Sequence, residues 1–146
     1  MKWSLITVGK PSITWARTAS DNYLGRIKRH ASVDWKMLRE GPEVEMTKRM
    51  LDASEGSLRV VLDEKGDTMT SKGMAQWIDQ QQITGRKRIS VLIGGANGHS
   101  AAVKLSADET WSLSALTLQH EMACVIFLEQ LYRGYSILSG SPYHRE

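Results

Sequence analysis

The run RISVLIGG, residues 88–95, is the feature of this sequence that most restricts the fold. It is apolar nearly throughout and stops at two glycines. Such a run is typical of a central strand in a parallel sheet, because helices cover that strand on both faces. Parallel strands also need long crossover connections, which are usually helices. The run therefore predicts an α/β chain whose mostly parallel sheet is flanked by helices.

The rest of the chain alternates strand-like and helix-like patterns around this run. Without a linker or an internal repeat, these elements fit a single domain of residues 1–146. Residues 111–118, WSLSALTL, are expected to be a short extended segment. The other predicted strands are 3–9, 31–38 and 58–63, and the predicted helices are 12–29, 43–56, 71–85, 99–107 and 121–138.

Capping and turn residues mark several boundaries of these elements. Ser12 or Thr14 is expected to cap the first helix, and Thr70 or Ser71 the third. The sequence EKGD at 64–67 is expected to turn the chain after its strand.

The last predicted helix, residues 121–138, is apolar nearly all round. A helix of this kind is covered on more than one side. One sheet covers only one side, so a second copy of the chain is a candidate for the other.

The charge is unevenly distributed along the chain. The formal net charge is +3, yet residues 1–50 hold ten Lys and Arg against five Asp and Glu. RIKRH at 26–30 and GRKR at 85–88 are the densest basic clusters. A basic surface favours polyanions, of which nucleic acid is the common case. The alternative is an ordinary solvated helix face.

Cysteine use and hydropathy indicate a reducing, cytoplasmic compartment. Cys124 is the one cysteine, so no internal disulfide can form, and its apolar neighbours favour a buried thiol. The opening MKWSLITVGK lacks the pattern of a secretory signal. No apolar run reaches the length of a membrane span, so no membrane partner is expected.

Two segments are candidates for ligand binding. LIGGANGHS, residues 92–100, runs from a strand into a glycine-rich bend. Ligands of open α/β sheets bind beyond the carboxyl ends of the strands, and glycines let them approach the backbone. LSALTL, residues 113–118, alternates small polar and apolar residues, so its backbone can face a flat polar ligand. The alternatives are a plain turn and a plain edge strand.

Metal and nucleophile chemistry find little support in the sequence. His120 and Cys124 share a helix face by spacing, but no second pair of ligands accompanies them. We therefore expect no metal site, and a core position for Cys124. No nucleophile elbow is present.

The end of the chain carries three further candidates. Arg133 lies on the apolar last helix, where it pairs either with Glu129, one turn earlier, or with a phosphate. Tyr143 offers a face for stacking on a base, and His144 offers a nitrogen that titrates near neutral pH.

Four motifs occur together in one bacterial family. VLIGGANG, WSLSALTL, EQLYRGYSIL and PYHRE stand in the family's order and at its separations. The sequence resembles the RlmH family of SPOUT-class methyltransferases, which methylate N3 of a pseudouridine in 23S rRNA. The resemblance spans the whole chain, is densest over residues 88–146, and is looser before Leu58.

This resemblance implies a SPOUT α/β fold with a C-terminal trefoil knot, an S-adenosylmethionine cofactor, and a homodimer that acts on 23S rRNA within the assembled ribosome rather than on DNA. It also implies that the tail of one subunit reaches the cofactor pocket of the other. By resemblance, the catalytic residues are Arg133, Tyr143 and His144, with Arg145 less closely matched; the cofactor contacts are Leu62, Gly95, Ser114, Ala115, Leu116, Thr117, Leu118 and Gln119.

Three residues depart from the family pattern. Gln119 and Glu121 stand where prolines are usual, and His99 stands where an aliphatic residue is common. We expect Gln119 to contact the cofactor through its backbone, in a loop less rigid than that of relatives. Two alternatives remain open: a non-catalytic module that binds RNA or the ribosome, and a SPOUT methyltransferase with another RNA target.

Overall fold

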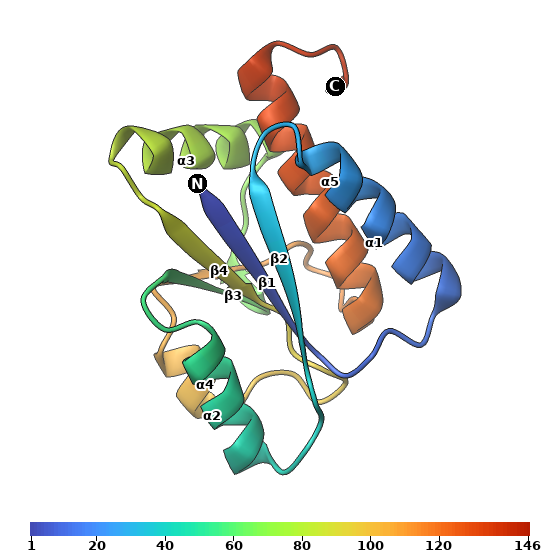
Figure 1. The fold of residues 1–146 in the computed structure, drawn as a ribbon, viewed down its shortest axis with the longest axis vertical. Helices are drawn as coiled ribbons and strands as arrows, with labels where there is room; N and C mark the ends of the chain where they lie inside the picture. The colour runs from blue at the N-terminus through green and yellow to red at the C-terminus, as the bar shows by residue number, and fades with distance from the viewer.

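A computed structural model describes residues 1–146 and contains one five-stranded sheet in which every strand pair is parallel. The strand order is β2-β1-β4-β3-β5, which places β4 at the centre, as its apolar sequence predicted (Figure 1). The elements are β1 Lys2–Val8, α1 Thr14–Ile27, β2 Ser32–Leu38, α2 Glu43–Ala53, β3 Leu58–Asp67, α3 Ser71–Ile83, β4 Arg88–Leu92, α4 Ala101–Leu105, β5 Glu109–Trp111 and α5 His120–Ser139.

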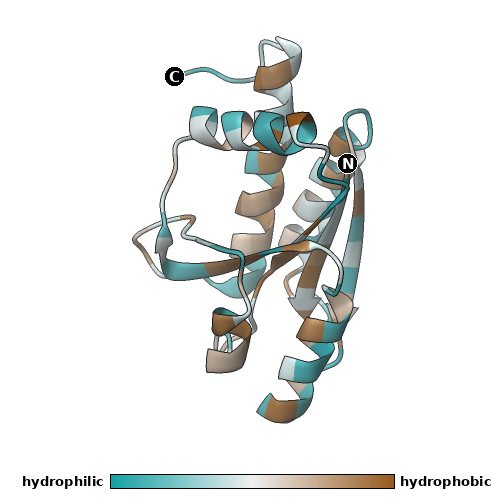
Figure 2. Cartoon of the chain, turned by 90° about the vertical axis from the view of Figure 1, so that its left-hand side faces the viewer, coloured by the Kyte–Doolittle hydropathy of each residue, from teal (hydrophilic) through white to brown (hydrophobic).

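Neighbouring residues of the central strands face two separate hydrophobic cores. Val60 and Val91 pack with α1, α3 and α5, whereas Val61 and Leu92 pack with α2 and α4. This alternation follows from the pleat of a strand, which points successive side chains to opposite faces. Figure 2 shows apolar colouring on the central strands and along α5. The predicted parallel sheet with helices on both faces is confirmed.

Helix α5 lies between α1 and α3 and packs against both (Figure 1). Its residues Phe127, Leu128 and Leu131 are fully covered. The two flanking helices thus cover much of the surface that the sequence assigned to a second copy. One face, at successive turns of the helix, stays only half-buried: Met122, Ile126, Glu129 and Arg133. We call this face the open stripe of α5.

Three local predictions were wrong, and each was overruled by residues distant in sequence. EKGD does not turn the chain, because β3 continues to Asp67 through a bulge in which Leu62 and Asp67 both pair with Trp111. Of WSLSALTL, only Trp111 lies in a strand, and the rest forms an irregular segment. No side chain of α1 caps that helix.

Other boundaries agree with the sequence. The Thr70 hydroxyl caps α3 by accepting a hydrogen bond from the N–H of Gly73 at 2.9 Å. Cys124 is buried as predicted, and burial raises the pKa of its thiol to about 11. None of the helices has the length and apolar character needed to cross a bilayer.

Candidate active site

A hollow of about 680 Å³ opens at the carboxyl ends of β3 and β4. Three segments form most of its wall: the end of β3 from Leu62 to Lys65, the bend Ile93–His99, and the stretch from Leu113 to His120 that leads into α5. We call it the carboxyl-edge hollow. Of the eight residues expected to contact a cofactor, it gathers seven and leaves Ala115 out of its lining; the seven are Leu62, Gly95, Ser114, Leu116, Thr117, Leu118 and Gln119.

The glycine bend after β4 is tight because two of its glycines nearly touch. A Cβ on Gly94 would lie 2.7 Å from the carbonyl carbon of Gly98, which is closer than any real contact. Gly98 adopts a φ of +72°, which disfavours other residues. Its N–H donates to the Gly95 carbonyl at 2.9 Å. At its three glycines, backbone rather than side chains therefore faces the hollow.

The opposite wall presents unused backbone groups. The N–H and C=O groups of Thr117 and Leu118 make no hydrogen bond within the chain. The segment is instead held by side chains: the Ser114 hydroxyl accepts from the N–H of Leu116 at 3.0 Å, and the Thr117 hydroxyl donates to Glu64. Such free donors and acceptors beside a hollow suit a polar, planar ligand.

Charged side chains ring the hollow at the end of β3. Asp63 accepts a hydrogen bond from the N–H of Lys65 and pairs with Lys104 at 3.2 Å, and these contacts, the N–H foremost, hold the pKa of its carboxyl below the usual range. His99 meets the carbonyl of Leu92 at 3.1 Å, and burial lowers the pKa of its imidazole. Near neutral pH the hollow therefore has a carboxylate on its wall beside an uncharged imidazole.

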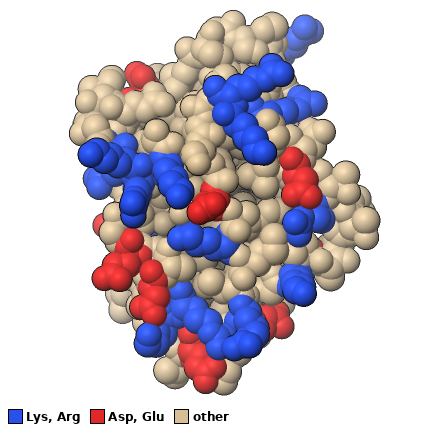
Figure 3. Space-filling model, in the orientation of Figure 1, with Lys and Arg blue, Asp and Glu red and all other residues tan.

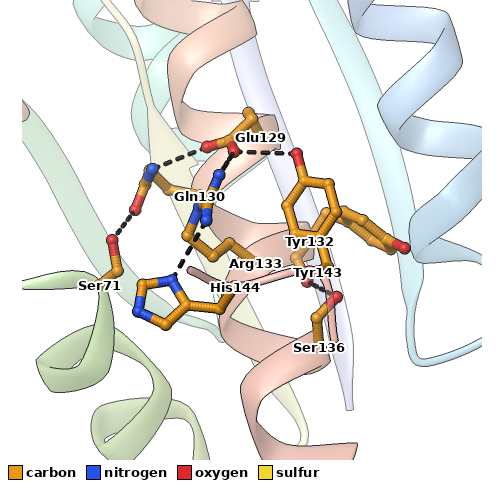
Figure 4. Close-up of polar contacts among 8 residues, drawn as sticks. All are labelled: Ser71, Glu129, Gln130, Tyr132, Arg133, Ser136, Tyr143 and His144. Atoms are coloured by element: carbon orange, nitrogen blue, oxygen red, sulfur yellow. Dashed lines mark hydrogen bonds and ion pairs between the residues drawn. The ribbon is translucent and has the colours of Figure 1, made fainter. Parts of the chain in front are cut away.

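The three residues predicted to be catalytic meet at the far end of α5. Glu129 accepts hydrogen bonds from Arg133 Nε at 3.1 Å and from the Tyr143 hydroxyl at 3.0 Å (Figure 4). Arg133 Nη1 meets His144 Nδ1 at 3.1 Å. Of the two partners expected for Arg133, this chain shows Glu129. The carboxylate thus joins the helix to the C-terminal tail, residues 140–146.

Aromatic contacts and ion pairs hold the tail further. The Tyr143 ring packs edge-on against Tyr132 with centroids 4.7 Å apart, and the Arg133 guanidinium lies 4.7 Å from the Tyr143 centroid. Burial, together with Tyr23 and Glu129, raises the pKa of Tyr143. Glu146 pairs with Lys72 of α3 at 2.8 Å. The tail is therefore folded onto its own chain.

His144 has one ring nitrogen committed and one without a hydrogen bond. A guanidinium has no acceptor, so Nδ1 of His144 must accept from Arg133. Its Nε2 is buried, has no hydrogen-bond partner, and lies 3.7 Å from a Glu146 oxygen. In this arrangement the lone pair of the imidazole is already in use.

The length of α5 separates these two groups of residues. His120, at its first turn, lines the hollow, whereas Arg133 lies at its fourth turn. A rise of about 1.5 Å per residue puts them about 20 Å apart along the axis. Transfer between groups needs reacting atoms about 3–3.5 Å apart. A single chain therefore does not bring the predicted cofactor and catalytic residues together.

Gln119 and Glu121, the two residues near the start of α5 that depart from the family pattern, both form hydrogen bonds that stabilise the fold. The Gln119 side chain caps the helix, because its Oε1 accepts from the N–H groups of Glu121 at 2.8 Å and Met122 at 3.0 Å. Glu121 reaches across to the start of α1 and accepts from the N–H of Ser12 at 2.8 Å and of Ile13 at 3.1 Å. These bonds tie down the segment that was expected to be less rigid than in relatives.

Sequence reasoning missed two acidic residues around these sites and foresaw only part of the role of a third. Asp63 and Glu64 come directly after the apolar run Val60–Leu62 of β3, so their place toward the carboxyl end of that run was a signal that could have found them. Glu129 was considered only as a partner of Arg133. Its contact with Tyr143 joins residues 14 apart and could not be read from helical spacing.

The family described as "Predicted SPOUT methyltransferase" matches residues 1–144 of this chain. The chain belongs to the SPOUT methyltransferase family. Proteins named Ribosomal RNA large subunit methyltransferase H are similar over their whole length: one from Thermus thermophilus is 38% identical over 145 residues, 99% of each chain. One from Methylibium petroleiphilum is 39% identical over 157 residues, 100% of each chain. The resemblance predicted from the four motifs is confirmed.

Solved structures of methyltransferases share the fold at low identity. A probable methyltransferase from Bordetella pertussis superposes with a TM-score of 0.59 at 10% identity, covering 91% of this chain and 95% of that one. The SpoU methyltransferase AviRb from Streptomyces viridochromogenes gives 0.52 at 18% identity, covering 95% of this chain and 61% of that one. At such identities the likeness extends to the fold alone.

Proposed function

We propose that this SPOUT chain is an S-adenosylmethionine-dependent methyltransferase that methylates N3 of a pseudouridine in 23S rRNA, on the assembled ribosome and as a homodimer. Its relatives carry the name of a large-subunit rRNA methyltransferase over full length. The observation that carries the proposal is the carboxyl-edge hollow, which gathers seven of the eight residues expected to hold the cofactor. Because its proposed substrate is the ribosome, the proposal includes a cytoplasmic location.

The hollow fits this cofactor in shape and in charge. The free backbone groups of Thr117 and Leu118 would bond the edge of the adenine, and the side-chain-free bend at Gly94 and Gly95 allows close approach. The carboxylate of Asp63 favours a cationic ligand. When bound, the cofactor supplies an activated methyl group on a sulfonium and leaves as a neutral thioether.

A second copy of the chain would complete the site. In a two-fold dimer both copies use the same surface. If the open stripes of two α5 helices pack antiparallel, the Arg133 end of one lies beside the His120 end of the other. This pairing would bridge the separation of about 20 Å within one chain. It would also bury Met122 and Ile126, which are half-exposed.

Each of the three predicted catalytic residues has a distinct role in the proposed reaction. N3 of the base loses its proton before it bonds to the methyl carbon, and the Arg133 guanidinium would stabilise the anionic base in that interval. Tyr143 positions the flipped-out nucleotide by stacking or hydrogen bonding. His144 can take the N3 proton only after its contact with Arg133 opens, because that contact uses its lone pair. Bulk water is the alternative acceptor.

The resemblance to SPOUT enzymes also implies one finer feature of the fold. We include in the proposal a trefoil knot in the C-terminal half of the chain. Its support is that the Ile93–His99 bend and the Leu113–His120 segment line one hollow, next to the start of α5.

Methyl transfer from labelled cofactor tests the proposal directly. Whole ribosomes, separate subunits, naked rRNA and tRNA serve as acceptors, and the modified base is then located. Incorporation at N3 of one pseudouridine, greatest on ribosomes, is expected. Incorporation into tRNA alone would show a SPOUT enzyme with another target. A chain that binds ribosomes but gives no heat with S-adenosylmethionine in calorimetry would be a non-catalytic module.

A further inference from the structure

The amino ends of the strands form a second edge of the molecule, opposite the hollow. Three strands begin there side by side, because Lys2 of β1 pairs with Ser32 of β2 on one side and with Arg88 of β4 on the other. The loops that enter these strands carry the two basic clusters noted in the sequence. They bring residues 28–29 and 86–88 to one edge, although these are far apart in the chain.

Five cations at this edge have no acidic partner, whereas Lys2 pairs with Asp34 at 3.6 Å. Arg86, Lys87 and Arg88 are exposed and form no ion pair, and the same holds for Lys28 and Arg29. We call these five residues the amino-edge surface. Figure 3 shows Lys and Arg side chains gathered over the turn between α1 and β2 and near the start of β4.

A concave site lies within this surface. A hollow of about 540 Å³ is lined by three of the cations together with two glycines and a threonine. No carboxylate or apolar side chain contributes to it. Its lining is Gly56, Thr84, Gly85, Arg86, Lys87 and Arg88. The carboxylates of the loops entering the strands are Glu55, which is exposed, and Asp108, which accepts from the N–H of Arg59. Such a surface attracts a polyanion.

The tail lies at this same end of the molecule. Figure 1 shows the C-terminus and the N-terminus at one end, away from α2 and α4. His30, which directly follows Lys28 and Arg29, has its ring centroid 6.2 Å from that of Tyr132, and Tyr132 packs edge-on against Tyr143 of the tail. The amino-edge surface therefore flanks the residues that, under the proposed function, receive the target nucleotide.

We propose that the amino-edge surface docks the phosphate backbone of the rRNA whose target base is presented to the partner's hollow. This inference rests on the proposed function and adds which surface of the chain binds the RNA substrate. Exposed cations position a nucleic acid through its phosphates and leave base recognition to other residues. Tyr143 and His144 of the adjacent tail supply that recognition. The subunit that donates the tail thus also holds the RNA.

Neutralising two of these cations tests the docking surface. The variant Arg86→Gln/Lys87→Gln is compared with Arg39→Gln/Lys48→Gln, which removes the same charge from exposed positions elsewhere. Methyl transfer to ribosomes is measured over a range of salt concentrations. Loss of two phosphate contacts should raise KM for ribosomes about tenfold near physiological salt and lower the slope of log KM against log salt by about 1.4. The kcat and the S-adenosylmethionine affinity should stay unchanged.

The outcomes separate this inference from the proposed function. Equal KM values for the two double variants would overturn the docking surface, while the wild-type enzyme still methylated ribosomes. A raised KM with an unchanged salt slope would point to a ribosomal protein contact and would also overturn it. If the wild-type chain transferred no methyl group to any RNA, the proposed function itself would fail. Cofactor calorimetry on each variant confirms that it is folded.

Discussion

The two ends of α5 differ in how their polar groups are satisfied. At its start, Thr117 and Leu118 leave backbone donors and acceptors unused beside a hollow. At its end, Glu129, Arg133 and Tyr143 satisfy one another through short contacts. We call the start of α5 the open end, because its unused groups are ready to receive a ligand. We call the other end the closed end, because its groups are already paired and must exchange partners before they can act. Under the proposed function, this difference would leave the cofactor side preformed and the substrate side to be completed by the second chain.

Removal of the Arg133 charge at the closed end should have the largest effect on activity. An Arg133→Gln chain keeps a hydrogen-bonding side chain but loses the charge that would stabilise an anionic base. We expect kcat to fall about 10²–10⁴-fold, a range typical of groups that assist proton removal. The affinity for S-adenosylmethionine, measured by calorimetry, should change less than twofold. A comparable loss of cofactor affinity would show that the two ends of α5 are not separate.

An Arg133→Lys chain is the matched control for this prediction. It keeps the charge but cannot reproduce the fork of contacts to Glu129 and His144. It should recover part of the lost kcat. Recovery of none would indicate that geometry rather than charge is what Arg133 supplies.

Distortion of the open end should act on cofactor binding instead. In Gly94→Ala the new Cβ would lie 2.7 Å from the Gly98 carbonyl carbon, so the bend must shift. We expect S-adenosylmethionine affinity to fall at least about tenfold and the free energy of unfolding to drop by about 1–3 kcal/mol. Gly25→Ala on α1 is the control, because a Cβ there meets nothing within 4 Å. It should stabilise the chain by about 0.5–1 kcal/mol.

Loosening the closed end without removing a catalytic candidate gives a smaller effect. Glu129→Gln preserves size but removes the carboxylate that holds Arg133 and Tyr143. The tail should then be cleaved faster by carboxypeptidase, and kcat should fall about tenfold, consistent with a positioning role. Unchanged cleavage of the tail would show that the aromatic contact with Tyr132 is sufficient to hold it.

The smallest effect is expected on stability at the start of α5. Burial alone would raise the pKa of Glu121, but the hydrogen bonds from Ile13 and Ser12 outweigh it and lower the pKa below 4.5. A depressed carboxyl pKa stabilises the folded state above the ordinary pKa, and this contribution is lost as pH falls. Glu121→Gln should therefore lower the free energy of unfolding by about 1–2 kcal/mol at pH 7.

The pH dependence of that difference is the check. Denaturant titrations at pH 7 should separate wild type from Glu121→Gln, and the gap should shrink below about pH 4, once the wild-type carboxyl is protonated. A gap that stayed constant with pH would mean that the charge of Glu121 contributes nothing to stability.

The sequence predicted those features that depend on local patterns. The apolar run of β4 indicated a central parallel strand, and Thr70 marked the start of α3 because a hydroxyl there caps a helix locally. The start of α1 was mispredicted because the N–H groups of Ser12 and Ile13, just before the helix, bond to Glu121, more than 100 residues away. The bulge of β3 likewise depends on packing of Gly66 against Thr110. Contacts of this kind leave no periodic signal.

The site shows the same division. Motifs picked out the residues that line the hollow and those that meet at the tail, since each group belongs to a short stretch of sequence. Their separation along α5, by contrast, follows only from the fold. The role of Glu129 as the link between helix and tail also required the folded geometry.

Mixing of two inactive variants tests the shared site most directly. One chain lacks residues 143–146, and the other carries Gly95→Trp and is confirmed by calorimetry not to bind S-adenosylmethionine. Each alone should be inactive on ribosomes. After co-refolding in equal amounts, about half of the dimers are mixed and each has one intact site, so about a quarter of wild-type activity should return. Mixed dimers, verified by mass, that remain inactive would contradict a site built from two chains.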